Sequence, residues 1–211
     1  MQLDAIQLAR VEALLAGGRR SILGLVGPPG CGKSTLAQAL VTTFPRQIQV
    51  VPMDGFHLAN AELQRLGRVG RKGAQDTFDS AGYVALLRRI KDPIRDEKIY
   101  APEFHRDIEE PVAGTIGVRS DTPLIVTEGN YLLLDQGPWA ALRALLDEAW
   151  YIEVPDPLRR DWLLQRHMRF GRTAEQAREW IAHTDEPNAR LIAATREHAD
   201  LVVRIAASAE P

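Results

Sequence analysis

The stretch Gly-Pro-Pro-Gly-Cys-Gly-Lys-Ser at residues 27–34 decides the fold. It matches the pattern G-x-x-x-x-G-K-[ST] of phosphate-binding loops, between a short apolar run at 21–26 and apolar residues at helical spacing over 33–44. Four fixed positions coincide by chance in fewer than about one in a hundred chains of this length, so a plain tight turn is the weaker alternative. We therefore predict a strand, a loop that binds phosphate groups, and a helix.

The residue types in this loop explain how it would hold phosphate. Small residues let backbone N–H groups close around the oxygens, and the following helix presents the positive end of its dipole. Lys33 is expected to reach the β- and γ-phosphates, and the Ser34 hydroxyl to bind Mg²⁺. Because Cys31 lies in this loop, we expect bound nucleotide to protect its thiol from reagents. The predicted nucleotide-binding residues are Gly27, Gly30, Cys31, Gly32, Lys33, Ser34 and Thr35, within a phosphate loop at 27–35.

Length and composition place this loop in one compact domain spanning residues 1–211. The net charge of -2, from 26 Lys and Arg against 28 Asp and Glu, removes the global argument for nucleic-acid binding. No window approaches the roughly 18 to 20 apolar residues of a membrane span, and the N-terminus lacks a signal pattern. The single cysteine cannot form an intramolecular disulfide, so we expect the reducing cytoplasm.

Apolar runs alternate with helical periodicity along the rest of the chain. Buried strands are predicted at 48–51, 124–127, 150–154 and 201–205, and shorter strands at 99–104 and 111–118. Helices are predicted over 2–16, 80–91, 139–146 and 156–172, with two more between 173 and 195. A long substrate loop is predicted at 53–79, with one short helix at 61–66. The alternation predicts an α/β fold of three layers, a mostly parallel central sheet with helices on both faces.

Two acidic residues follow predicted strands. Asp54 comes after the strand at 48–51 and Glu128 after that at 124–127, so both are expected at the edge where open α/β sheets bind ligands. Asp54 could take the proton from a substrate hydroxyl, and Glu128 could bind Mg²⁺ through a water or orient Asp54. Turn or capping acids are the structural alternatives. His57 is interpreted as a substrate contact rather than the base.

Arginines crowd the predicted helix at 156–172. Three of them, Arg166, Arg169 and Arg172, are spaced by three residues and are expected on one helical flank. Guanidinium groups suit the spread charge of a transferring phosphoryl group, so with the phosphate loop present we interpret the helix as a lid rather than a solvated basic face. A second basic stretch at 65–72 is expected to face the same anionic ligand.

Together these residues resemble the P-loop kinases of small hydroxyl metabolites, which include uridine kinase, phosphoribulokinase and bacterial pantothenate kinase. The likeness runs from residue 22 to 203 and is strongest to bacterial proteins described as fructose-transport-system or nucleoside-type kinases. It implies an enzyme dependent on ATP and Mg²⁺, with Asp54 as the base and Arg166 and Arg169 as the phosphate clamp. The matching segments are the loop at 27–34, Asp54-Gly55-Phe56, Arg71-Lys72-Gly73, Phe78-Asp79, Glu128-Gly129, Trp162 with Arg166, Arg169 and Phe170, and Thr195-Arg196-Glu197 with Ala199.

Departures from the family bear on the phosphoryl acceptor. Pantothenate kinases carry a histidine at the position of Pro102 and a tyrosine at that of Leu163, so pantothenate is disfavoured. Uridine kinases have a Tyr, then a His and an Arg, in this region, and Tyr100, His105 and Arg106 match them with altered spacing. A nucleoside therefore remains an alternative acceptor to a sugar such as fructose. The residues assigned to the acceptor are Phe56, His57, Tyr100, His105, Arg106 and Asn130.

The predicted partner is a small hydroxyl substrate, with no nucleic acid, and a homodimer is left open. A regulatory ATPase linked to a transporter is the alternative from another class, and an acid poised for an acceptor beside a lid favours the kinase. A GTPase is disfavoured because no Asn-Lys-x-Asp signature occurs. The presence of Lys33, Ser34, Asp54 and Glu128 argues against a binding module without turnover.

Overall fold

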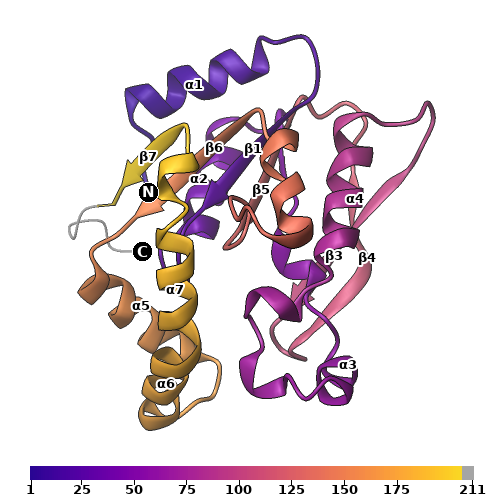
Figure 1. The fold of residues 1–211 in the computed structure, drawn as a ribbon. Coiled ribbons are helices and arrows are strands. Elements are labelled where there is room, and N and C mark those ends of the chain that lie inside the picture. Colours follow the sequence, from indigo (N-terminus) through magenta and orange to yellow (C-terminus); the bar gives the residue numbers. More distant parts are fainter. Residues whose placement is uncertain (206–211) are drawn as a thin grey trace.

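Five parallel strands form the central sheet of the computed structural model, which describes residues 1–205; residues 206–211 of the predicted domain lie outside this range. The strand order is β2-β5-β1-β6-β7 (Figure 1), which confirms the predicted parallel α/β sheet. The chain crosses from β1 to one edge and later returns to its other side, so the switch point of the sheet lies at the carboxyl end of β1. The strands are β1 (Ser21–Val26), β2 (Ile48–Val50), β5 (Leu124–Gly129), β6 (Glu148–Glu153) and β7 (Leu201–Arg204).

Side chains of β1 alternate between the two faces of the sheet. Ile22 and Val26 pack in one apolar cluster, Leu23 and Leu25 in the other, and all four are fully buried. Burial of each such side chain stabilises the fold by roughly 1.5–3 kcal/mol. Helices cover both clusters, which gives three layers. On the Leu23 face lie α1 (Ala5–Leu15) and α2 (Lys33–Thr43), and on the Ile22 face lie α4 (Ser80–Lys91) and α7 (Glu186–Ala193).

A separate hairpin and a helical arm complete the fold. The hairpin pairs β3 (Ile99–His105) with β4 (Glu110–Val118) antiparallel, apart from the main sheet. In Figure 1 it stands, with α3 (Asn60–Arg65), across from the arm that runs through α5 and α6 into α7. The arm consists of α5 (Asp156–Arg169), α6 (Ala174–Trp180), a π-helical turn at Ile181–Asp185, and α7. No helix within residues 1–205 is both long and apolar enough to cross a bilayer.

The predicted helix at 139–146 is wrong in type. The chain instead forms two 3-10 helices, Gly137–Ala141 and Arg143–Leu145. A 3-10 helix places residues i and i+3 on one side, which buries Trp139 and Leu142 together against the Ile22 face of the sheet. Tertiary packing therefore overrides the helical propensity of this segment.

The predicted lid helix is too long by three residues, because α5 ends at Arg169. Gly171 adopts a left-handed conformation with φ 95°, its N–H bonds to the carbonyl of Met168, and the Arg172 N–H bonds to that of His167. This pair of bonds is the Schellman motif that closes helices at a glycine. Arg172 thus lies beyond the helix, and the prediction that it shares a flank with Arg166 and Arg169 is wrong.

Candidate active site

A cavity of about 1080 Å³ opens at the carboxyl edge of the sheet, beside the switch point at β1. Its wall is built from segments far apart in sequence: the phosphate loop, the 3-10 turn Met53–Phe56 after β2, the end of β5, the hairpin tip, and the arm from α5 to α7. Parallel strands bring their carboxyl ends to one edge, which explains why loops after β1, β2 and β5 meet here.

The phosphate loop has the backbone that its glycines permit. Gly30 has φ 80°, and a side chain there would begin 2.5 Å from Leu163 Cγ and 3.0 Å from the carbonyl oxygen of Arg159. The loop therefore packs tightly beneath α5, and only glycine fits at this position. The cavity wall includes Gly30, Gly32, Lys33, Ser34 and Thr35, the part of the loop that opens α2.

Lys33 is buried and folded across its own loop. Its Nζ donates to the carbonyl oxygens of Gly27 at 2.9 Å and Pro28 at 3.2 Å, and to Asn130 Oδ1 at 2.8 Å. These partners are neutral, so the ammonium charge has no carboxylate within hydrogen-bond distance among residues 1–205. Asn130, which the sequence assigned to the acceptor, lies on the cavity wall and bonds to the phosphate-loop lysine.

Ser34 and Glu128 meet as a hydroxyl–carboxylate pair. Ser34 Oγ donates to Glu128 Oε1 at 2.7 Å. Burial, and next the nearby Asp54 carboxylate, raise the pKa of Glu128. Residues 1–205 hold no cluster of three or more His, Cys, Asp or Glu side chains suited to an ion. The pair fits Mg²⁺, which takes few protein oxygens and completes its shell with phosphate oxygens and water.

Cys31 points away from the cavity into the core. Its side chain is fully buried with Leu36 and Ile152, and burial raises the pKa of its thiol despite the helix N-terminus. Gly27 is also buried and forms no part of the cavity wall. The expectation that a nucleotide would shield the thiol is therefore replaced by one in which the fold itself shields it.

We expect the native protein to react negligibly with an aromatic disulfide reagent at pH 7.5, with or without ATP. The thiol has no solvent-exposed surface, so labelling requires opening of the fold. The absorbance of the released thiolate measures the rate, and protein unfolded in guanidinium chloride serves as the control that labels fully. Rapid labelling of ligand-free protein that ATP blocks would contradict this placement.

Asp54 lies across the cavity mouth from the phosphate loop, in the 3-10 turn Met53–Phe56. The turn packs against the hairpin so closely that a side chain at Gly55 would begin 2.2 Å from the carbonyl oxygen of Pro102. The Asp54 carboxylate is 38% exposed, and its Oδ2 lies 3.5 Å from Arg106 Nη2. An accessible carboxylate at this position can accept a proton from a ligand in the cavity.

His57 lies beside Asp54 as a neutral hydrogen-bonding group. Burial lowers the pKa of His57, so the ring is uncharged at neutral pH. Its Nδ1 lies 2.7 Å from the Asp54 carbonyl oxygen and must donate to it, which leaves Nε2 as the acceptor. The ring packs between Phe78 and Phe104, with centroids 4.0 and 4.7 Å away.

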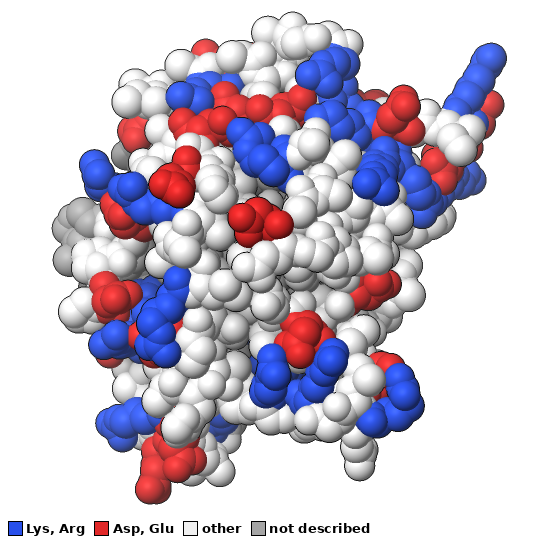
Figure 2. Space-filling view, in the orientation of Figure 1, with Lys and Arg blue, Asp and Glu red and all other residues white. Residues whose placement is uncertain are grey.

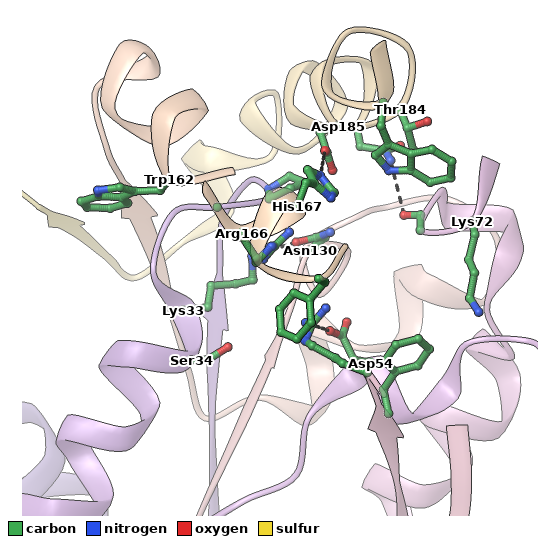
Figure 3. A pocket seen from close by; sticks show the side chains of 18 of the residues that line it. Lys33, Ser34, Asp54, Lys72, Asn130, Trp162, Arg166, His167, Thr184 and Asp185 are labelled. Carbon is green, nitrogen blue, oxygen red and sulfur yellow. Dashed lines mark hydrogen bonds and ion pairs between the residues drawn. The ribbon is translucent and has the colours of Figure 1, made fainter. Parts of the chain in front are cut away.

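Arg166 projects from α5 into the cavity, between the phosphate loop and Asp54 (Figure 3). Burial lowers its pKa, while the carboxylates of Asp185 and Asp54 oppose that shift. Among residues 1–205 no group accepts a hydrogen bond from this guanidinium. Arg169 also lines the cavity and is exposed. Arg106 lies 6.0 Å from the ring centroid of Phe104 and 5.6 Å from that of Phe170.

The structure does not bring three of the residues assigned to the acceptor to the cavity wall. Phe56 packs against Tyr83 at a centroid distance of 5.1 Å, below the Asp54 turn. Tyr100 is 56% exposed on the outer side of β3, because alternate residues of a strand face opposite ways. His105 has its closest charged partner in Glu103, 3.9 Å away on the same strand.

Each of the two basic stretches reaches the cavity with only part of its residues, and the others form ion pairs. Arg65 pairs with Glu62, Arg68 and Arg71 pair with Asp76, and Arg159 and Arg160 pair with Glu186. In Figure 2, basic and acidic side chains likewise stand next to each other on the face shown. The basic residues that line the cavity are Lys33, Lys72, Arg106, Arg166, Arg169 and Arg172.

Sequence reasoning missed most of the wall opposite Asp54, namely His167, Trp180, Thr184 and Asp185, from the end of α5 to the π-helical turn. Asn188, which the sequence offers as a pocket asparagine of open role, also lies on this wall. Asn188 Nδ2 donates to the Gly73 carbonyl oxygen at 3.3 Å, which links the arm to the loop at 53–79. A single sequence carries no motif for this set, because its members converge only through the packing of α5 against the arm from α6 to α7.

Comparison with known proteins identifies the family. The family model described as "Phosphoribulokinase / Uridine kinase family" matches residues 22–209, and the chain belongs to this family of P-loop kinases. The protein named "Putative uridine kinase C227.14" from Schizosaccharomyces pombe is 33% identical over 206 residues, covering 92% of this chain and 87% of that protein. "Uncharacterized protein YggC" from Escherichia coli is 34% identical over 192 residues, covering 89% and 78%.

A solved structure agrees with this assignment. It is described as a "putative fructose transport system kinase" from Silicibacter sp. TM1040, with 35% identity, a TM-score of 0.84, and coverage of 95% of this chain and 99% of that one. The chain is therefore a phosphotransferase of the P-loop kinase class, and the family implies ATP binding at the phosphate loop.

Proposed function

We propose that this protein transfers the γ-phosphoryl group of Mg·ATP to a hydroxyl group of a small metabolite, with a sugar such as fructose as the favoured acceptor. The observation that carries the proposal is the place of Asp54: an accessible carboxylate in the same cavity as the phosphate loop, with Arg166 between them. A fructose-type acceptor draws support from the similar structure described as a fructose transport system kinase.

Each catalytic role follows from a position on the wall. Asp54 accepts the proton of the acceptor hydroxyl as its oxygen attacks the γ-phosphorus. Lys33 exchanges its neutral carbonyl partners for phosphate oxygens of the bound nucleotide. The ammonium group is already buried at the loop, so it loses little further hydration when the phosphates bind. Arg166 and Arg169 stabilise the negative charge on the transferring group, and α5 excludes water from it. His57 and Arg106 contact the acceptor, while Asn130 orients Lys33.

Ser34 and Glu128 are the residues that would hold Mg²⁺. When bound, the ion would supply positive charge to the β- and γ-phosphate oxygens. ATP as the donor and the single buried thiol are both compatible with a cytoplasmic protein.

Two further acceptor classes and one further function are tested beside the sugar. A nucleoside is suggested by the relative named as a putative uridine kinase, and pantothenate by a relative, 28% identical over 163 residues, that is named pantothenate kinase. A regulatory ATPase would use the same phosphate loop without an acceptor. The accessible Asp54 carboxylate favours the kinase, because ATP hydrolysis requires no acceptor-side base in the cavity beside the phosphate loop.

A panel of acceptors tests the proposal. Purified protein with Mg·ATP is given fructose, other sugars, uridine or pantothenate, and ADP formation and the phosphorylated product are both measured. We expect ADP formation to depend on a sugar and to match the sugar phosphate formed one to one. ADP formation that is the same without any acceptor would reject the kinase in favour of the ATPase.

A further inference from the structure

The π-helical turn between α6 and α7 places two polar side chains in the cavity. Pro187 has no N–H and cannot continue the α-helical ladder, and the chain widens into the π-helical turn Ile181–Asp185 just before it. Thr184 and Asp185, at the end of this turn, are both 7% exposed, and both lie on the cavity wall. In Figure 3 they stand on the side of the cavity opposite Asp54.

One oxygen of the Asp185 carboxylate is held and the other is free. His167 Nε2 lies 2.8 Å from Asp185 Oδ2, and Arg172 Nη1 approaches His167 Nδ1 at 3.5 Å. An arginine can only donate, so Nδ1 is the acceptor and the imidazole Nε2–H donates to Asp185. Within residues 1–205 no group donates to Oδ1. Oδ1 is not among the buried side-chain oxygens that lack a partner, and Asp185 lines the cavity, so Oδ1 is open to the cavity and can accept a hydrogen bond from a ligand there.

The surroundings of Asp185 fit a neutral, hydroxyl-rich ligand. Thr184 and Asn188 offer uncharged polar groups beside it, and His57 offers a neutral ring across the cavity. Arg166 and Arg172 lie close to the Asp185 carboxylate, so its charge is partly compensated. The free oxygen can only accept a hydrogen bond, so the ligand group beside it must be a donor such as a hydroxyl and not an anionic oxygen.

Asp79, the acid of the Phe78-Asp79 segment, is not available for this task. Its Oδ1 accepts the Gly82 N–H at 2.8 Å as the N-cap of α4, and it does not line the cavity. Apart from Asp54, the acids on the wall are Glu109, Glu128, Asp161 and Asp185. Asp185 alone among these four lies both on the arm and below a tenth exposed.

We infer that Asp185 is a specificity-determining residue that accepts a hydrogen bond from an acceptor hydroxyl remote from the one phosphorylated. The ligand class is a neutral compound with at least two hydroxyl groups, one at Asp54 and one at Asp185. His167 is a positioning residue that orients the carboxylate. This inference rests on the proposed function for the identity of the site, and names the chemistry of its acceptor.

The test separates binding from turnover. ADP-loaded protein is titrated in a calorimeter with D-fructose, D-ribose, uridine and pantothenate, using wild type, Asp185→Asn and Glu179→Gln, an exposed acid on α6 outside the cavity. We expect a neutral polyhydroxyl compound to bind wild type and the Glu179→Gln control alike. Asp185→Asn should weaken it about 10- to 100-fold, as for a lost hydrogen bond to a charged group.

A hydroxyl-deletion series distinguishes contact from mere support of the fold. Wild type and Asp185→Asn are titrated with monodeoxy analogues of the sugar that binds. The analogue that lacks the hydroxyl at Asp185 should bind weakly to wild type and with the same affinity to Asp185→Asn. Equal weakening of all analogues, or unchanged sugar binding by Asp185→Asn, would overturn the inference. So would binding of pantothenate alone, or of none of the neutral compounds. If the sugar binds in this pattern but ATP is hydrolysed without it, the proposed kinase function fails and the hydroxyl site stands.

Discussion

Asp54→Asn is expected to lower kcat for acceptor phosphorylation by about 10²- to 10⁴-fold, the usual contribution of a general base. Asparagine keeps the size of the side chain but cannot take the hydroxyl proton. The KM for ATP should change by less than about threefold, because Asp54 lies across the cavity from the phosphate loop and contacts Arg106 rather than the loop. The measurement is product formation at saturating ATP and acceptor.

Asp107→Asn is the matched control for this variant. Asp107 is exposed in the hairpin tip next to Arg106 and does not line the cavity, so its replacement should leave kcat unchanged. A loss of less than tenfold in Asp54→Asn, with the control unaffected, would show that Asp54 is not the base. Glu128, the other acid near the phosphate loop, would then be the candidate base.

Arg166→Ala should lower kcat by about 10³-fold, with a much smaller effect on ATP affinity. The guanidinium is partly buried on the cavity wall and bonds to no acceptor within residues 1–205, so its hydrogen-bonding capacity is kept for a ligand. Because the charge on the phosphoryl oxygens is redistributed in the transition state, removing this group affects the chemical step more than ground-state binding.

Steady-state kinetics and equilibrium binding of ATP together check the Arg166 prediction. Arg178→Ala, at an exposed position of α6 outside the cavity, controls for loss of an arginine from the arm. An unchanged kcat in Arg166→Ala would remove this residue from the mechanism. A fall in ATP affinity equal to the fall in kcat would instead assign it to nucleotide binding.

Local patterns in the sequence were sufficient for the sheet and for the nucleotide half of the site. The run at 21–26, the glycines and Lys33 of the loop, and the helix after it are adjacent in the chain, and their spacing alone defines the phosphate cradle. Asp54 and Glu128 were placed at the same edge because each follows a buried strand, and the carboxyl ends of parallel strands meet there.

The acceptor half depended on contacts between distant segments. Tyr100 and His105 echo a family pattern in sequence, yet the hairpin turns Tyr100 outward, while Asp185 and His167 carry no motif and form a pair across 18 residues. The basic stretches also depend on such contacts. From the sequence, Arg68 and Arg159 are expected to bind an anionic ligand, but the fold pairs them with Asp76 and Glu186.

The sequence by itself determined that this chain has a phosphate loop on a parallel α/β sheet, with one cysteine inside that loop and a net charge of -2. Tertiary structure alone decided that Cys31 faces the core, that α5 ends at Arg169 before the left-handed Gly171, that a π-helical turn precedes α7, and that Asp185 lies across the cavity from Asp54. The physical reason is range: turn and strand chemistry acts between neighbours in the chain, whereas burial and ion pairing depend on which segments the fold brings together.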